Sequence, residues 1–432
     1  MKSEWTKVEL GGLIDTQKGF AFKSSWYTSF GVPIVRVSDF TDNSISINEI
    51  NYISNDLAEE HIKHQLQFRD ILIQTVGSWQ SNPASIVGKV VTVPIDLNGA
   101  LLNQNAVKIV PKSEIDKRFL YYRLKEENFK LHNLNHAQGA ANQASITLES
   151  IKKFNFKLPP LPTQRKIASI LSSYDDLIEN NLKRIQLLEE KAQLTYEEWF
   201  VKMRFPGYET AKFDAFTGLP EGWEIKNIGA ICKVSGGGTP SRAIDEYWND
   251  GDIIWYSPTD LSKANSLCVL DSSQKITEIG LKKSSAKLLD TNSFMMTSRA
   301  TIGLFALINK PFSTNQGFIN VTPLNEFEKE YLLYNFKYRI EEFKGHATGA
   351  TFPELSKSKF NALDIIWPSA ESLKQFNKIT SILHIQLFNL TEQNRLLKEA
   401  RDILLPRLMS GMIDVDKITG QVVEEMETFK NK

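Results

Sequence analysis

Two segments of the chain carry a hydrophobic residue at every seventh position. In the first segment, the repeating column is Leu171, Ile178, Ile185, Ala192 and Trp199, and its partner column is Tyr174, Asn181, Leu188 and Thr195. In the second segment, the column is Leu383, Leu390, Leu397 and Leu404, beside Thr380, Leu387, Asn394 and Leu408. Heptads sustained over this length predict two long helices that pair as a coiled coil, not helices lying on a globular core.

Polar residues interrupt both columns. Asn181 and Asn394 fall at positions where a polar group can fix the register of a coiled coil at some cost in stability. The same residues could instead face solvent at the edge of the seam, and the pattern alone does not decide between the two. Pro406 is expected to end or kink the second helix near Leu405, because proline lacks the backbone N–H.

The regions that precede each helix mix short β-rich runs with turn signals. The runs in the first region are residues 32–37, 71–74, 86–93 and 106–110, followed by a helical stretch at 119–124. The second region follows the same order, with runs at residues 252–256, 293–296 and 302–308 and a helical stretch at 331–334. This pattern predicts two α+β domains.

Several short strings recur in both halves of the chain. The matched pairs are Trp5 and Trp223, Asn103-Gln104 and Asn315-Gln316, and Gly139-Ala140 and Gly349-Ala350. The middles of the halves otherwise diverge. A shared frame with different polar loops suits two different recognition domains on one scaffold, although an old duplication whose symmetry has no remaining role would leave the same trace.

The order of the segments favours an antiparallel helix pair. The first helix must deliver the chain to the second domain, and the second helix can bury its seam only by running back along the first. The predicted architecture is therefore a pseudo-twofold repeat with a globular domain at either end of a two-helix coiled coil. The expected divisions are 1–160 (first domain), 161–205 (first helix), 206–370 (second domain), 371–411 (second helix) and 412–432 (tail). A helix of about 40 residues is about 60 Å long.

Composition limits the class of protein. At 432 residues the chain is too long for one ordinary core. It lacks an apolar run long enough to span a membrane and a signal peptide, and its two cysteines, Cys232 and Cys268, are too few for a disulfide framework. We therefore expect a soluble cytoplasmic protein. Lysine plus arginine equals aspartate plus glutamate at 51 each, so a nucleic-acid surface would need its basic groups gathered on one face.

Motifs for catalysis or metal binding are incomplete. The glycine-rich segment 236–240 is not followed by the Gly-Lys-Ser/Thr of a phosphate-binding loop. Asn82-Pro83 lacks the second proline and the aromatic residue of an adenine methyltransferase motif. His61 and His64 lie three apart without further ligands to complete a metal site, so surface histidines are the preferred interpretation. The sequence predicts no catalytic residue and no metal site.

Particular strings resemble one known family. They are Leu161-Pro162-Thr163-Gln164 with the helix after it, Trp199-Phe200, Arg204-Phe205-Pro206-Gly207, Gly19-Phe20-Ala21-Phe22-Lys23-Ser24, Gly238-Thr239-Pro240-Ser241 and Tyr247-Trp248. In their order and repetition the chain resembles the DNA specificity subunit of type I restriction-modification systems over nearly its whole length. The second helix departs from the family pattern, because Pro368 is followed only later by Lys374-Gln375, and this leaves the start of that helix open.

The resemblance implies a targeting subunit that is not itself an enzyme. It implies that each globular domain recognises one half of a split target in double-stranded DNA, while the paired helices set the spacing and dock two modification subunits. Those partners would bind S-adenosylmethionine and methylate adenine, and a restriction or motor subunit would use ATP and magnesium. The chain itself is expected to bind no cofactor and to contact no membrane.

Polar residues in turn-rich stretches are the candidates for DNA contact. Arginine, asparagine and glutamine can form paired hydrogen bonds to base edges, and lysine, serine and threonine can hold phosphates. The candidates in the first domain are Lys18, Lys23, Arg36, Gln74, Ser78, Gln80, Asn82 and Gln138. Those in the second are Thr239, Ser241, Arg242, Ser298, Arg299 and Thr348. For each one, solvated surface or helix capping is an alternative role.

Three classes of function fit the sequence to different degrees. A self-contained methyltransferase or nuclease would need cofactor or metal motifs that the chain lacks. A purely structural coiled-coil protein is compatible with the neutral net charge. The preferred interpretation is a non-catalytic DNA-recognition subunit. Binding of duplex DNA would separate it from the structural class, and methyl transfer by the chain alone would test the enzyme class.

Overall fold

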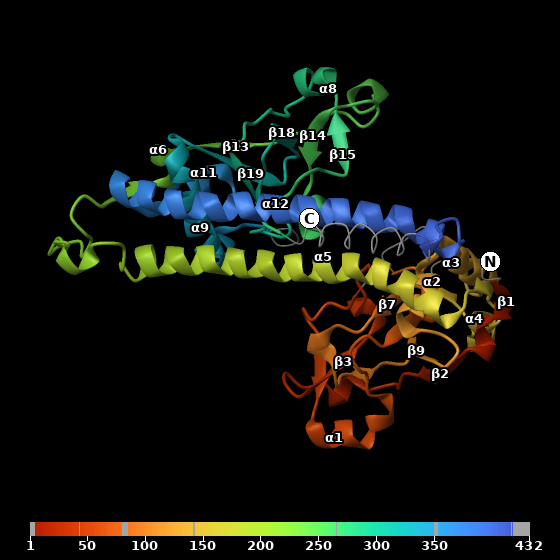
Figure 1. Cartoon of the computed structure of the whole chain (residues 1–432). Helices are drawn as coiled ribbons and strands as arrows, with labels where there is room; N and C mark the ends of the chain where they lie inside the picture. The colour runs from red at the N-terminus through yellow and green to blue at the C-terminus, as the bar shows by residue number, and fades with distance from the viewer. Residues whose placement is uncertain are drawn as a thin grey trace, which may run out of the picture. The chain divides into compact units, whose positions relative to one another are not determined.

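The computed structural model describes residues 5–42, 44–79, 85–140, 143–264, 266–349, 353–415 and 417. The chain forms two compact units. Unit 1 comprises Met1–Asp176 with Lys398–Lys432, and unit 2 comprises Leu177–Leu397. Two long helices, α5 (Leu161–Tyr196) and α12 (Ala370–Met409), each contribute residues to both units (Figure 1).

Unit 1 contains a four-stranded and a three-stranded sheet. The four-stranded sheet is antiparallel, in the order β2 (Ile14–Lys18), β9 (Ala106–Pro111), β5 (Ile71–Gln74) and β7 (Val90–Thr92). The second has the order β4 (Asn51–Ile53), β3 (Val32–Val35) and β8 (Leu101–Leu102), with β3 parallel to β8. A strand pair joins β1 (Thr6–Glu9) to β11 (Asn155–Leu158). The helices of this unit are α1 (Asn55–Glu60), α2 (Lys117–Lys125), α3 (Glu127–His136) and α4 (Leu148–Lys152).

Unit 2 repeats these sheets strand for strand. Its four-stranded sheet has the order β13 (Cys232–Gly236), β19 (Phe318–Pro323), β16 (Phe294–Thr297) and β17 (Phe305–Leu307). Its three-stranded sheet has the order β15 (Gln274–Ile276), β14 (Ile253–Tyr256) and β18 (Phe312–Thr314), again with one parallel pair. The strand pair is β12 (Glu224–Asn227) with β20 (Asp364–Trp367). The helices are α6 (Ile228–Ile231), α7 (Pro258–Ser262), α8 (Glu278–Lys282), α9 (Lys329–Tyr338), α10 (Ile340–His346) and α11 (Lys357–Ala362). The predicted α+β fold and its internal repeat are confirmed.

The central strands are apolar on both faces because both faces are covered. Ile71, Leu72 and Ile73 of β5 are fully buried, as are Phe294 and Met296 of the equivalent β16. Burial of this kind contributes about 25 cal/mol per Å² of apolar surface, so each strand is held by packing as well as by its hydrogen bonds. The short β-rich runs of the sequence are therefore the cores of the two units.

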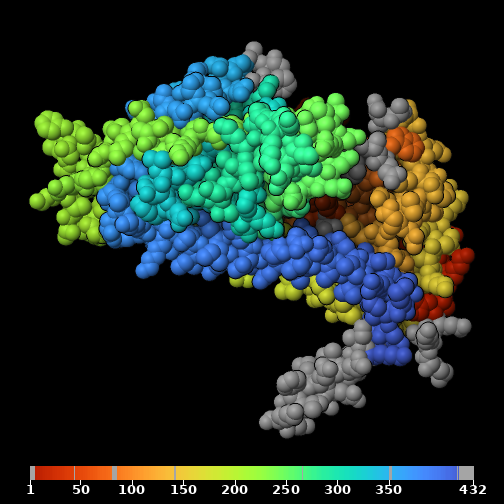
Figure 2. Space-filling view, turned by 90° about the horizontal axis from the view of Figure 1, so that it is seen from above, coloured from red at the N-terminus to blue at the C-terminus, as the bar shows by residue number. Residues whose placement is uncertain are grey.

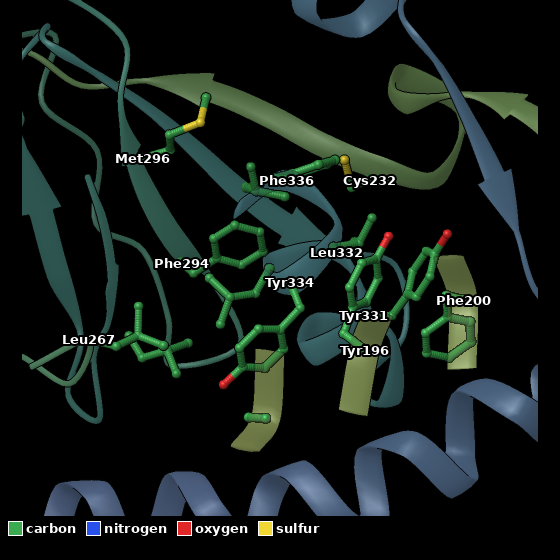
Figure 3. Packing of buried hydrophobic residues seen from close by; sticks show 14 of the residues in the cluster. Tyr196, Phe200, Cys232, Leu267, Phe294, Met296, Tyr331, Leu332, Tyr334 and Phe336 are labelled. Carbon is green, nitrogen blue, oxygen red and sulfur yellow. The ribbon is translucent and has the colours of Figure 1, made fainter. Parts of the chain in front are cut away.

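The core of unit 2 is rich in aromatic rings. Tyr196 and Phe200 pack with Tyr331 of α9, with ring centroids 5.9 Å and 4.8 Å from Tyr331 (Figure 3). The neighbouring Tyr334 and Phe294 continue this cluster toward the sheet. The end of α5 is thereby part of the core of unit 2.

A buried glutamine fastens the start of α5. The Gln164 side chain is 1% exposed, and its Oε1 accepts the backbone N–H of Asp116 at 2.8 Å. Its amide nitrogen donates to the carbonyls of Glu114 and Pro159 at 3.3 and 2.8 Å. The glutamine of the Leu-Pro-Thr-Gln string thus has a structural role, in which its side chain holds the start of α5 against the neighbouring backbone. Counted from the start of each helix, the equivalent position in α12 is the buried Leu373, so that helix begins at Ala370 without a glutamine.

The ends of the two long helices differ from the sequence prediction. The first was expected to run to residue 205, but α5 ends at Tyr196 and a π-helical turn follows at Glu197–Val201, where Trp199 and Phe200 are buried. Pro406 does not end the second helix near Leu405, since α12 continues to Met409, inside the expected range 371–411. Pro406 removes one hydrogen bond of the last turn and crowds the carbonyl four residues before it, and the buried Leu408 and Met409 hold that turn by packing.

The described helices include none that is both long enough and apolar enough to cross a membrane.

Candidate nucleic-acid interface and helix pair

Two loops of unit 1 are joined side by side and carry two of the candidate DNA contacts. Strand β6 (Val76–Gly77) pairs with β10 (Ala144–Ser145), and Gln138 forms an isolated bridge with Ser145. The indole N–H of Trp79 donates to the carbonyl of Ala140 at 3.0 Å. Ser78 is half-buried and Gln138 is exposed, so the two candidates sit on one platform of paired loops. The candidates Gln80 and Asn82 lie outside the described residues.

Unit 2 builds the same platform from the equivalent loops. Arg299 and Thr348 each form a bridge with Glu354, and the backbone N–H of Leu355 donates to the carbonyl of Ser298 at 2.9 Å. Arg299 and Thr348 are both exposed. Ala300 has a φ of 62°, a left-handed conformation that costs a non-glycine residue free energy and that recurs at functional sites. The strain lies directly beside the exposed arginine.

A recurring glycine shapes both platforms. Gly139 and Gly349 have φ values of 147° and 123°, a region that L side chains rarely adopt. A Cβ at Gly139 would lie 2.0 Å from the carbonyl oxygen of Gln143. The Gly-Ala string therefore recurs because the turn needs glycine, not because both units contact the same base.

A second loop of unit 1 carries Lys18 and Lys23. It leaves the end of β2 and is fastened by aromatic packing, in which the ring of Phe20 stacks on that of His61 with centroids 4.1 Å apart. The His64 Nδ1 bonds the carbonyl of Lys18 at 2.9 Å. Burial lowers the pKa of His64 below its ordinary value despite that hydrogen bond, and nearby positive charge adds to the effect. Both lysine side chains are exposed.

The equivalent loop of unit 2 carries Thr239, Ser241 and Arg242. The Thr239 hydroxyl donates to Oε1 of Gln316 at 2.6 Å, which ties the loop to the Asn-Gln turn. The guanidinium of Arg242 lies 3.6 Å from the ring centroid of Trp248. Arg242 and Ser241 are exposed, and Thr239 is half-buried.

Two candidate side chains are buried, and a third is held in an ion pair. Gln74 is 1% exposed, and its amide donates to the carbonyls of Val76 and Ser85, so its assignment to DNA contact is corrected to a support for the platform. Ser298 is 3% exposed and is likewise removed from the surface. Arg36 forms an ion pair with Asp39 at 2.9 Å inside its own turn. The sequence alone did not distinguish these polar residues from exposed ones. Residues in loops follow no regular pattern of burial, so the sequence does not reveal which polar side chains a neighbouring loop will cover.

The two long helices pair along the predicted seam in an antiparallel sense. In unit 2, the amide of Asn181 donates to Oδ1 of Asn394 at 3.0 Å, and the rings of Trp199 and Phe376 lie 5.8 Å apart. Eighteen residues forward from Asn181 to Trp199 thus correspond to eighteen residues back from Asn394 to Phe376, so the register is constant. In unit 1, Asp175 of α5 pairs with Arg401 of α12, which continues the same order.

The seam positions are buried or half-buried throughout. The buried ones are Leu171, Ile178, Asn181, Ile185, Leu383, Leu387, Leu390 and Asn394. The half-buried ones are Tyr174, Leu188, Leu397 and Leu404. Asn181 and Asn394 are 6% and 5% exposed, so the structure places them in the seam and not at its solvent edge. Their mutual hydrogen bond satisfies part of the polarity that burial would otherwise leave unpaired.

Each unit also fastens the helix pair through a tyrosine. In unit 1 the hydroxyl of Tyr122 donates to Asp175 at 2.5 Å, and Asp175 also binds the guanidinium of Arg401. In unit 2 the hydroxyl of Tyr334 bonds Nε2 of His384 at 2.8 Å. Sequence reasoning missed these fastenings, because the partners are far apart along the chain and a single polar residue on a helix gives no signal.

The described residues contain no group of three or more histidine, cysteine, aspartate or glutamate side chains able to hold a metal ion. His61 and His64 take part in the aromatic packing around Phe20. Burial raises the pKa of Cys232 to about 12 and also raises that of Cys268, so both thiols stay protonated and have little nucleophilic character at neutral pH.

Both halves of the chain match one protein family. A family model described as the type I restriction modification DNA specificity domain matches residues 2–190 and again residues 220–399. The chain belongs to this family. The double match assigns one DNA-specificity domain to each half, in agreement with the strand-for-strand repeat of the two units.

Individual relatives support the assignment. The chain is 36% identical to the MjaIX specificity subunit of a type I restriction enzyme from Methanocaldococcus jannaschii over 205 residues, which are 47% of this chain and 46% of that protein. It is 25% identical to the HindI specificity subunit from Haemophilus influenzae over 95% of this chain and 100% of that protein. The type I restriction-modification S subunit from M. genitalium shares the fold, with a TM-score of 0.56 and 17% identity over 94% of this chain and 96% of that chain.

Proposed function

We propose that this chain is the DNA-recognition subunit of a type I restriction-modification enzyme, in which each unit recognises one half of a bipartite target. The observation that carries the proposal is the repeat of one sheet order in two units whose exposed loops differ. Shared framework positions support two domains of one kind, and different loop residues support two different sequences.

The paired loops are the proposed surfaces for base contact. In unit 1 they present Ser78 and Gln138, and in unit 2 they present Arg299 and Thr348, of which Gln138 and Thr348 lie at equivalent places. Glutamine can form two hydrogen bonds to adenine, and arginine can form two to guanine, so Gln138 and Arg299 would favour different bases. The strained backbone at Ala300, directly after the exposed Arg299, supports the proposal, because such strain recurs at functional sites.

The helix pair is the proposed spacer between the half-sites. Two helices of 36 and 40 residues correspond to about 54 and 60 Å at 1.5 Å per residue. Their constant register and their buried asparagine pair support a rigid element of defined length. The length of this element would then set the number of base pairs between the two recognised sequences.

The outer face of the helix pair is the proposed docking surface for two modification subunits. Within unit 2, large apolar residues on it are about half exposed, namely Leu187, Leu194, Ile382 and Ile385. An open groove of ≈ 620 Å³ adjoins them and is lined by Leu188, Trp199, Ile379 and Ile382, with Lys191 and Lys378 among its polar residues. The outer face of α12 is visible as a continuous blue strip in Figure 2. Exposed apolar surface of this kind is typical of protein interfaces, and the lysines favour acidic residues on the partner.

The chemistry would then be carried by partners. A modification subunit would supply S-adenosylmethionine and transfer its methyl group to adenine, and a restriction or motor subunit would use ATP and magnesium. This chain would be non-catalytic, with no cofactor of its own, and would act in the cytoplasm, where it directs the assembly to DNA.

An exchange of domains tests the proposal. The chain is produced together with its modification subunits, and methylated adenines are mapped across the host genome with and without it. We expect a split methylated sequence that depends on the chain. Replacement of residues 206–370 by the equivalent region of another specificity subunit should change one half of that sequence and leave the other half and the gap unchanged.

Replacement of residues 1–160 serves as the matched control and should change the opposite half. A change in both halves after either exchange would contradict independent recognition. Methylation that does not depend on the chain would contradict the proposed function itself.

A further inference from the structure

In each unit, one loop holds a cation against a tryptophan at an equivalent place in the fold. We propose that the cations, Lys23 in unit 1 and Arg242 in unit 2, bind DNA phosphates and give each unit the same sequence-independent contact. The inference rests on the proposed function, and it adds a division of labour in which these two loops position the DNA and the paired loops select its sequence.

Both loops leave the first strand of the four-stranded sheet through a glycine. A Cβ at Gly19 would lie 1.9 Å from the carbonyl oxygen of Asn103, and one at Gly237 would lie 2.1 Å from that of Thr314. In each unit the residue after this glycine donates its backbone N–H to strand β8 or β18, from Phe20 to Leu102 and from Gly238 to Thr314. The two loops therefore start at the same point and in the same direction relative to their sheets.

The loop in unit 2 is rigidly held. The indole N–H of Trp255 donates to the carbonyl of Gly238 at 2.9 Å, and that of Trp248 donates to the carbonyl of Ser241 at 3.0 Å. Arg242 lies 3.6 Å from the ring centroid of Trp248, and one of its terminal nitrogens donates to Oε1 of Gln274 at 2.6 Å. Its position is thus fixed before any ligand arrives.

The loop in unit 1 reaches the same result with different residues. Phe20 stacks on His61, and the ring of Trp26 lies nearly parallel to that of Phe20 with centroids 6.4 Å apart. The Nζ of Lys23 lies 5.3 Å from the centroid of Trp26. Aromatic packing again fixes the loop, and the Lys23 side chain is exposed on it.

Phosphate is the ligand that this arrangement fits. A guanidinium has five N–H donors, and stacking on a ring leaves its in-plane donors available to an anion. The two units have different base-contacting loops, so a contact that recurs in both must be compatible with different DNA sequences. Phosphate contacts meet this condition, because they position a protein on DNA without distinguishing the bases. Preorganisation lowers the entropy that binding would otherwise cost.

The salt dependence of binding tests the assignment. The full-length chain in complex with its modification subunits is titrated with a mixed-sequence duplex and with a duplex carrying the mapped target, over a series of KCl concentrations. Neutralising one phosphate contact changes the slope of log K against log [salt] by about 0.9. We expect K23Q and R242Q each to lower the magnitude of the slope by about that amount, and the double variant by about twice as much, with equal loss of affinity for both duplexes.

Two lysines provide matched controls. Lys157 in β11 and Lys226 in β12 lie on the equivalent strand pairs of the two units, and K157Q and K226Q remove the same charge without touching either loop. We expect their slopes to equal that of the unmodified complex. R242K keeps the positive charge but not the planar group that stacks on Trp248. Because the slope of log K against log [salt] reports the charge at the phosphate, R242K should retain most of the slope that R242Q loses.

The outcomes separate the inference from the proposed function. Unchanged slopes for K23Q and R242Q in a complex that still prefers the target duplex would overturn the phosphate assignment alone. Loss of affinity confined to the target duplex would also overturn it, since it would indicate base contact. Failure of the unmodified complex to prefer its target would instead count against the proposed function.

Discussion

In unit 1 and in unit 2, a tyrosine at an equivalent position forms a hydrogen bond to one of the long helices, but the group that it contacts differs. Tyr122 of α2 and Tyr334 of α9 occupy the same place in the repeat, after the equivalent strands β9 and β19. In unit 1 the hydroxyl donates to the carboxylate of Asp175, and in unit 2 it meets the imidazole of His384. Both contacts reach one of the long helices, so the position is kept while the partner changes from a carboxylate to an imidazole.

The groups bonded to the partners of these tyrosines also differ. Asp175 binds Arg401, whereas His384 lies 3.5 Å from the carboxylate of Glu330. Burial together with the charge and hydrogen bond of Asp175 raises the pKa of Tyr122 well above its usual value. Burial acts to raise the pKa of Glu330 as well, but His384, Asn377 and Lys329 together hold it below its usual value.

The two units therefore share a backbone framework, but the polar contacts that attach it to the long helices vary independently of that framework. Sheet order and the backbone turns recur because glycine and buried strands dictate them, whereas the polar contacts to the helices differ from unit to unit. Unit 2 adds aromatic packing around Phe376, whereas the equivalent position in unit 1, counted from the start of each long helix, is Ile167. Removing one fastening at a time measures how much each unit depends on its own chemistry.

The largest effect is expected at Phe376. Its ring is fully buried and lies within 6.4 Å, centroid to centroid, of Tyr196, Trp199, Phe200 and Tyr334. Truncation of a buried phenylalanine leaves a cavity, so F376A should lower the free energy of unfolding by about 4 kcal/mol, measured by urea denaturation. I382A on the exposed side of the same helix is the control and should cost about 0.5 kcal/mol or less. Equal losses would show that the aromatic cluster does not hold the helix.

A matched pair of substitutions compares the tyrosine fastenings. Y122F removes a hydrogen bond to a charged carboxylate and should cost about 2 kcal/mol, whereas Y334F removes a bond to an imidazole and should cost about 1 kcal/mol. Hydrogen exchange at the backbone amides of α5 and α12 would locate each loss in its own unit. A larger loss for Y334F would reverse the assigned order of the two contacts.

The smallest effect is expected from acid. Because the pKa of Glu330 is lower in the folded chain than its ordinary value of 4.5, its contribution to stability is present above about pH 4.5. That contribution is lost as the pH falls through the lower, folded-state pKa. E330Q should flatten this acid-dependent loss in urea titrations, and E221Q at an exposed site should not. An identical acid profile for all three proteins would show that the Glu330 network does not stabilise unit 2.

The fold was predictable where the pattern is periodic. Heptads from Leu171 to Trp199 and from Leu383 to Leu404 predicted the helix pair, and apolar runs such as 71–74 predicted the central strands. The exact ends of the helices were less predictable. The expected range 371–411 already extended the second helix past Pro406, and α12 does continue to Met409, because the buried Leu408 and Met409 hold its last turn despite the lost hydrogen bond.

The candidate surface was predictable only in part. Short-range patterns placed Gln138 and Thr348 in loops, but they could not show that Gln74 and Ser298 would be buried beneath those loops. Contacts between residues far apart in the sequence could not be predicted either, since nothing near Asp175 in the sequence indicates Arg401 as its partner.

A change in the length of the helix pair tests the central claim most directly. One heptad is inserted into α5 and one into α12 at facing positions, which preserves the seam because seven residues keep nearly the same helix face. The insertion lengthens the pair by about 10.5 Å, or about 3 bp of duplex at about 3.4 Å per base pair. We expect the methylated sequence to keep both halves and to gain about 3 bp in the gap between them. A gap of unchanged length, with both halves still methylated, would contradict the account.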